Sequence, residues 1–132
     1  MAQDFDPIPE QANLVAKEVV DAAIAVHRTL GPGLIESVYR VCLCHELSKR
    51  GLAFQFEQDL PVVYDGVRLE SGLRPDIIVE QCVIVETKAV EKMHPVYEAQ
   101  ILTYLKLTGC RLGLLIDFNV KLLKDGIQRI VR

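Results

Sequence analysis

Apolar residues recur every three or four positions over residues 10–30, with polar side chains between them. This spacing is typical of an amphipathic helix that packs one face against a core. The apolar stripe consists of Val15, Val19, Ala23, Val26 and Leu30. The run Gly31-Pro32-Gly33 follows and predicts the end of the helix, because glycine and proline both interrupt helical backbone.

Two further helices are predicted at residues 34–50 and 95–108. Gly51 suits the position just after the first of them, where a left-handed backbone is common. For the second, Pro95 suits the first turn and Gly109 suits the position after the last residue.

Short apolar and β-branched runs occupy much of the remaining chain. Asp65-Gly66 separates two of these runs and predicts a hairpin, because its turn needs positive φ. The run 111–118 is apolar without alternation, as expected for a strand covered on both faces. The candidate strands are residues 53–57, 60–64, 67–69, 76–80, 83–88 and 111–118, with 127–131 as a final candidate in a short tail.

The resulting order, α-α-β-β-β-β-α-β, predicts an α/β (α+β) fold with a central mixed β-sheet flanked by helices. The length of 132 residues suits one domain, and we expect it to span residues 1–132 with residues 1–9 as a loose leader. No apolar run reaches the ~18 residues of a membrane span, and the acidic N-terminus does not resemble a signal peptide. We therefore expect a cytoplasmic protein without membrane association.

The net charge of −3 argues against strong, non-specific binding of nucleic acid. The charge is uneven, however. Residues 1–66 contain 5 Lys or Arg and 10 Asp or Glu, giving −5, whereas residues 67–132 contain 10 and 8, giving +2. A basic C-terminal segment contains Lys121, Lys124, Arg129 and Arg132. It is either a local basic surface or, more commonly for such runs, a solvated face.

Asp76, Glu86 and Lys88 lie at the ends of two apolar runs, residues 77–79 and 83–85. A charged residue at the end of a buried strand loses solvation, so it needs a partner or a function. Two carboxylates and an ammonium group can hold a hard divalent cation and polarise a water, as phosphodiester hydrolysis requires. A structural ion pair at a strand end explains the same residues equally well.

The catalytic interpretation makes a geometric demand. Glu86 and Lys88 share one face of a strand because they are two residues apart. Asp76 lies opposite Glu86 only if three residues, 80–82, form the loop between the strands; a loop of two would place Asp76 opposite Thr87. If the demand is met, Asp76, Glu86 and the backbone carbonyl of Thr87 become candidate metal ligands, and Lys88 could position the attacking water.

Two pairs of helical residues are further candidates. Glu36 and Tyr39 share a helix face near the glycine break, and Gln100 and Tyr104 share a face of the later helix. In the functional interpretation all four point to the active face of the sheet. In the structural interpretation Glu36 complements its helix dipole and Tyr104 packs in the core.

Arg74 and Lys92 could bind phosphate, although a solvated surface role is the commoner one. The four cysteines form no CxxC pair and the three histidines show no ligand spacing, so a zinc site is not expected. There is also no P-loop, GxGxxG, GxSxG or HExxH motif, which excludes the nucleotide-triphosphate, dinucleotide and serine-hydrolase classes that these motifs define.

The segment Gly33-Leu34-Ile35-Glu36-Ser37-Val38-Tyr39 resembles the signature of the GxxExxY protein family. The resemblance extends along nearly the whole chain. It includes Phe56-Glu57-Gln58, Tyr64-Asp65-Gly66, Glu86-Thr87-Lys88-Ala89-Val90, Glu98-Ala99-Gln100, Tyr104-Leu105 and Phe118-Asn119-Val120. That family resembles a compact branch of the PD-(D/E)xK nuclease-like superfamily, which implies a restriction-endonuclease-like core and a site for Mg²⁺ or Mn²⁺.

The resemblance implies a role for each matching residue. Asp76 matches the superfamily's aspartate, Glu86 and Lys88 match its (D/E)xK, and Glu36 matches an acidic residue of the first core helix. Gln100 and Tyr104 resemble the QxxxY element of the RecB-like branch. The implied site comprises Glu36, Asp76, Glu86, Lys88, Gln100 and Tyr104, with Thr87 as a backbone ligand and Tyr39, Arg74 and Lys92 as substrate-binding residues.

The leading hypothesis is therefore a metal-dependent nuclease that hydrolyses DNA or, less favoured, RNA. One alternative is a catalytically silent nuclease fold that serves as an interaction or regulatory module. Another is an enzyme for small phosphodiesters or nucleotides. A domain of this size has little surface to grip a duplex, so a homodimer or a protein partner could complete it.

Overall fold

The computed structural model describes residues 6–132 of the chain. Predicted residues 1–5 of the leader lie outside this range, and residues 6–9 lead directly into the first helix. The helices are α1 (Glu10–Leu30), α2 (Glu36–Lys49) and α3 (Pro95–Thr108), with a short 3-10 helix η1 (Leu123–Gly126). The strands are β1 (Phe54–Phe56), β2 (Leu60–Tyr64), β3 (Val67–Leu73), β4 (Ile77–Val79), β5 (Val83–Lys88), β6 (Leu112–Asp117) and β7 (Ile127–Val131).

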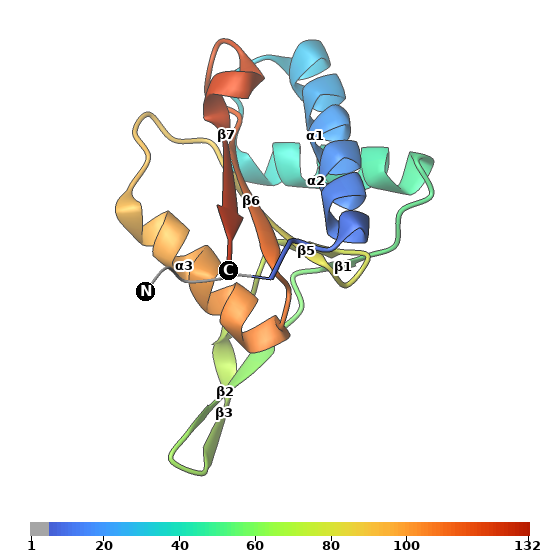
Figure 1. Cartoon of the computed structure of the whole chain (residues 1–132). Coiled ribbons are helices and arrows are strands. Elements are labelled where there is room, and N and C mark those ends of the chain that lie inside the picture. Colours follow the sequence, from blue (N-terminus) through green and yellow to red (C-terminus); the bar gives the residue numbers. More distant parts are fainter. Residues whose placement is uncertain (1–5) are drawn as a thin grey trace, which may run out of the picture.

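A five-stranded sheet with the order β1-β4-β5-β6-β7 forms the centre of the molecule. Strands β5 and β6 are parallel and are connected through α3, whereas the other neighbours are antiparallel. Strands β2 and β3 form a separate two-stranded hairpin that projects from the end of the sheet opposite η1 (Figure 1). The predicted mixed sheet is therefore confirmed.

Helices cover both faces of this sheet, with α1 and α2 on one side and α3 on the other (Figure 1). In β4, Ile77 and Val79 pack into the core under α1 and α2, while Ile78 between them packs into the core under α3. The alternation follows from the two-residue period of a strand. The apolar run of β6 is buried on both faces for the same reason, as the sequence predicted.

Close packing of α3 on β6 depends on Gly113. A Cβ atom there would lie 2.5 Å from Cγ2 of Ile101 on α3, closer than side chains approach in folded proteins. The missing side chain therefore lets the helix approach the strand whose C-terminal end borders the candidate site.

Three details of the predicted elements need correction. All five candidate strands before α3 are present and β7 follows β6, so the predicted order α-α-β-β-β-β-α-β is one strand short on each side of α3. The second strand of the hairpin extends to Leu73 rather than ending at residue 69. Leu30 is 36% exposed, unlike the rest of its stripe, because α1 ends there and the chain turns away at Gly31.

Candidate active site

The turn between β4 and β5 fixes the register of the candidate site. Ile77 pairs with Val85 and Val79 pairs with Val83, which leaves three residues, Glu80 to Cys82, in the turn. Asp76 therefore lies beside Glu86 at the open end of the hairpin, and its backbone N–H donates to Oε2 of Glu86 at 2.9 Å. The loop between the strands thus has the three residues that the catalytic interpretation requires.

The Asp76 carboxylate is held from two sides. Oδ2 accepts hydrogen bonds from the N–H of Thr87 at 2.8 Å and from its hydroxyl at 2.9 Å. Oδ1 accepts one from Nη1 of Arg40 at 3.1 Å. The carboxylate is therefore fixed to β5 on one side and to α2 on the other. Thr87 makes these contacts through its donors, so the ligand role proposed for its carbonyl stays a prediction.

Arg40 joins three carboxylates that come from separate parts of the chain. Its guanidinium lies 3.0 Å from Oε1 of Glu57, 3.1 Å from Oδ1 of Asp76 and 3.8 Å from Oε2 of Glu36. Glu57 has φ of 51°, a left-handed conformation that costs energy for a residue with a side chain. We call Glu36, Glu57, Asp76 and Glu86, with Arg40 and Lys88, the acidic centre.

Glu86 is the most deeply buried carboxylate of the acidic centre, with 4% of its surface exposed. Burial, followed by the nearby charge of Asp76, raises its pKa to about 9. Burial also raises the pKa of Glu36, against the opposing charge of Lys88. Both shifts arise because a buried carboxylate without sufficient positive charge nearby favours its neutral form.

Lys88 extends from the end of β5 toward α3. Its Nζ lies 4.3 Å from the centre of the Tyr97 ring, within the range of a cation–π contact. The ring therefore limits where the ammonium group can move. Tyr97 is on the first turn of α3, and no pattern in the sequence had singled it out.

The structure places Gln100 and Tyr104 differently, although they are one turn apart on α3. Tyr104 is buried, and its pKa is raised by burial and then by the charge of Glu86, so its hydroxyl lies near the acidic centre. Gln100 is exposed. It would reach the acidic centre only from the surface of the helix.

The three residues predicted to bind substrate are not gathered at one point. Tyr39 is fully buried, and its hydroxyl donates to Gly31 O at 2.6 Å and accepts from Leu34 N–H at 3.1 Å, so its role is to support the turn between α1 and α2. Arg74 is exposed and binds Asp59 at 2.9 Å. Lys92 is exposed in the segment before α3.

The donor set of the acidic centre suits Mg²⁺ or Mn²⁺, because both prefer carboxylate oxygens. The raised pKa of Glu86 also indicates a buried carboxylate that a cation would stabilise. Within residues 6–132, however, no group of three His, Cys, Asp or Glu side chains is already arranged to hold a metal ion. Asp76 already accepts hydrogen bonds from Arg40 and Thr87, so a metal ion would share its carboxylate with these donors or replace the arginine at Oδ1.

Besides Tyr97, three residues at or beside the site were not predicted as site residues from the sequence: Arg40, Glu57 and Asp117. Arg40 could have been suspected, because it lies four residues after Glu36 on a predicted helix, where opposite charges meet. Glu57 was noted only as part of the family resemblance. Asp117 pairs in register with Lys88, and its Oδ1 accepts from Val90 N–H at 3.1 Å and Asn119 N–H at 3.0 Å, which holds together the segments that follow β5 and β6.

The fold and the arrangement of Asp76, Glu86 and Lys88 define a restriction-endonuclease-like protein. The chain belongs to the PD-(D/E)XK nuclease superfamily, whose sequence model matches residues 13–130. No curated protein and no solved structure gives a significant match to the chain. The superfamily expected from the sequence is thus confirmed, and it implies a nucleic-acid substrate. No helix in residues 6–132 is long and apolar enough to cross a membrane.

Proposed function

We propose that this protein is a metal-dependent nuclease that hydrolyses phosphodiester bonds in DNA, with RNA as the less favoured substrate. The observation that carries the proposal is the three-residue turn between β4 and β5, which sets Asp76 beside Glu86 on the same edge as Lys88. Membership of the PD-(D/E)XK nuclease superfamily supports the same chemistry.

In this proposal Asp76 and Glu86 hold Mg²⁺ or Mn²⁺, with Glu36 and the carbonyl of Thr87 as further ligands. The metal ion supplies positive charge for the phosphate and lowers the pKa of a bound water. Lys88, whose position the Tyr97 ring limits, would orient the attacking water or contact the phosphate. Tyr104 supports Glu86 from below the surface, and Gln100 contacts the substrate from the exposed side of α3.

A second candidate function is a silent nuclease fold that binds a partner without turnover. The observation that favours it is the Arg40 guanidinium, which already forms ion pairs with Asp76 and Glu57 at 3.1 and 3.0 Å. If that arrangement persists with metal present, the ligands stay blocked. A homodimer or a protein partner would then supply the function.

The experiment is cleavage of single- and double-stranded DNA and RNA with Mg²⁺, Mn²⁺ or EDTA. Glu86→Gln and Lys88→Met are the test variants, while Glu98→Gln and Lys106→Met are matched controls at exposed positions of α3. Cleavage that needs metal, disappears in both test variants and persists in both controls would support the nuclease. Isothermal titration with Mn²⁺ on the same proteins separates a failure of metal binding from a failure of catalysis.

A further inference from the structure

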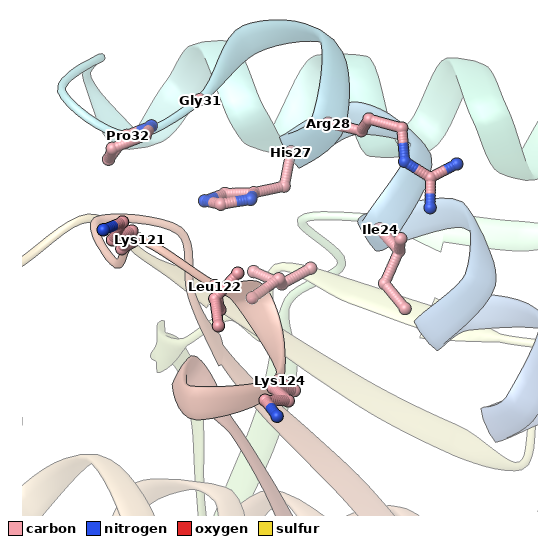
Figure 2. Close-up of a pocket in the computed structure, with 9 residues that line it drawn as sticks. Ile24, His27, Arg28, Gly31, Pro32, Lys121, Leu122 and Lys124 are labelled. Carbon is pink, nitrogen blue, oxygen red and sulfur yellow. The ribbon is translucent and has the colours of Figure 1, made fainter.

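A hollow of about 460 Å³ lies between the C-terminal end of α1 and the segment that joins β6 to β7. We call it the basic hollow. In Figure 2 the end of α1, with His27 and Arg28, faces the segment that carries Lys121 and Lys124. Four basic residues from two distant parts of the chain therefore line one depression, together with apolar residues such as Ile24 and Leu123.

The positive charge of the basic hollow is not neutralised by the chain. Arg28, Lys121 and Lys124 are exposed, and none of them forms an ion pair with another residue of the described range 6–132. Among residues 6–132, no acidic residue lines the hollow; Asp125 is exposed beside Lys124 but does not line it. Such unbalanced charge attracts an anion from solution.

The wall that carries the lysines is fixed rather than loosely attached. The His27 ring donates from Nε2 to Val120 O at 2.8 Å, which ties α1 to the segment after β6. Leu123 is buried in the core shared with α1. At Gly126 a Cβ atom would lie 2.1 Å from Asp117 O, so η1 packs directly on the end of β6. The cationic groups are thus held on a preformed surface.

The basic hollow shares structural supports with the acidic centre. Phe118, which begins the segment that carries the lysines, donates its N–H to Lys88 O at 2.8 Å. Its ring stacks on Tyr39 with a centroid distance of 4.6 Å and lies 6.4 Å from the His27 ring. Tyr39 in turn donates to Gly31 O, and Gly31 lines the hollow. Both sites therefore lie at the C-terminal end of the parallel strands β5 and β6.

We propose that the basic hollow binds the phosphodiester backbone of a nucleic-acid strand beside the bond presented to the acidic centre. This inference rests on the proposed nuclease function. The acidic centre repels phosphates when it holds no metal, so affinity must come from cationic groups elsewhere. Arg28, Lys121 and Lys124 supply such groups on the same end of the sheet.

The test is the binding of short fluorescein-labelled single- and double-stranded DNA and RNA by fluorescence anisotropy, in EDTA and over a range of salt concentrations. The variant is Lys121→Glu with Lys124→Glu. The control is Lys17→Glu with Lys106→Glu, which changes the net charge equally at exposed positions on the outer surfaces of α1 and α3. Hydrolysis of bis(4-nitrophenyl) phosphate with Mn²⁺ is measured beside it, because that small diester does not need the hollow.

We expect the variant to bind nucleic acid at least about tenfold more weakly than the wild type at low salt. The slope of its log affinity against log salt concentration should be smaller by the equivalent of about two phosphate contacts. We expect the control to lose much less affinity for nucleic acid, and the variant to hydrolyse the small diester at the wild-type rate. Wild-type affinity and salt dependence in the variant would overturn the proposal. Equal losses in the control would also overturn it, because net charge alone would then explain the effect.

The two proposals fail in different ways. Weaker binding by the variant, combined with no cleavage by the wild type, would retain the basic hollow and reject the nuclease. Metal-dependent cleavage by the wild type, with unchanged binding by the variant, would support the nuclease and reject the basic hollow as a binding site for nucleic acid. Absence of nucleic-acid binding by the wild type, or binding only to an acidic peptide or to anionic vesicles, would overturn the occupant proposed for the hollow.

Discussion

In the acidic centre the chain supplies partners for its own charges, whereas in the basic hollow it does not. Arg40 lies 3.0 Å from Glu57 and 3.1 Å from Asp76, and Glu86 accepts the Asp76 N–H at 2.9 Å. Arg28, Lys121 and Lys124 instead have no ion-pair partner among residues 6–132. The two regions lie at the same end of the sheet, and the proposed nuclease function gives them different roles.

A reaction centre has to hold its groups in place before the substrate arrives. If the acidic centre is the proposed active site, the hydrogen bonds to Asp76 from Thr87 and Arg40 have this effect there. A backbone-binding surface gains affinity by exchanging solution counterions for phosphates, so internal partners would reduce its affinity. The comparison therefore predicts large effects on turnover and stability from the acidic centre, and effects on salt-dependent binding from the basic hollow.

The largest effect is expected from Glu86→Gln on cleavage. Loss of a metal ligand beside Asp76 should reduce the rate roughly 10³-fold, in the range of a lost catalytic group. The variant should remain folded in EDTA at neutral pH, because burial already favours the neutral form of Glu86. Cleavage rates and thermal melts on one preparation measure both. Full activity in a well-folded Glu86→Gln would remove the acidic centre from the mechanism.

The next effect is expected from Arg40→Met on stability without metal. Removing the guanidinium leaves Asp76 and Glu57 without their shared cation, and we expect a loss of about 2–3 kcal/mol in the free energy of unfolding. Mg²⁺ should recover part of this loss, since the metal ion replaces the missing charge. Urea unfolding with EDTA or Mg²⁺ is the measurement.

The matched control for Arg40 is Arg50→Met. Arg50 pairs with the partly exposed Glu18 at 3.5 Å, and exposed pairs contribute about 1 kcal/mol or less. If both substitutions lower the free energy of unfolding by the same amount, Arg40 is not the counter-ion of the acidic centre. The contrast between the acidic centre and the basic hollow would then lose its main support.

The pH dependence of stability is the third expectation. The folded-state pKa of Glu86 lies above its ordinary value of 4.5, so the folded protein keeps a proton that the unfolded chain releases. Stability of the metal-free protein should therefore fall as the pH rises from 4.5 toward about 9, because the unfolded chain loses this proton before the folded protein does. Glu86→Gln should flatten this slope. If stability depends on pH as steeply in Glu86→Gln as in the wild type, ionisable groups other than Glu86 cause the dependence.

Local patterns predicted most of the helices and strands well. Helices α1 and α3 and strands β2, β5 and β7 have the predicted bounds, because periodicity and turn residues act over a few positions. The length of the turn between β4 and β5 was left open by these patterns, because the predicted bounds 76–80 and 83–88 leave two residues between the strands, whereas the structure leaves three. The superfamily resemblance added the link between these residues and nucleolytic chemistry.

Contacts between distant segments could not be predicted in this way. Arg40 meets Asp76 across 36 positions of sequence, and Arg28 shares a hollow with Lys121 only because α1 packs beside η1. The predicted basic segment also divides, since Lys121 and Lys124 line the hollow while Arg129 on β7 binds Asn13. Such outcomes depend on how helices dock on the sheet, which spacing alone does not encode.

The smallest effect is expected from Tyr97, which limits the position of Lys88. The ammonium group lies 4.3 Å from the ring centre at a partly exposed site, where a cation–π contact contributes about 0.5–1 kcal/mol. Tyr97→Leu should therefore lower kcat for cleavage by roughly two- to fivefold with KM unchanged, because the lysine is less well placed at the acidic centre but the basic hollow is intact. Tyr97→Phe keeps the ring and should retain wild-type kcat, and Tyr64→Leu on the exposed hairpin is the control. A rise in KM without a change in kcat would instead place Tyr97 among the substrate-binding residues, and the division of roles between the two regions would have to be redrawn.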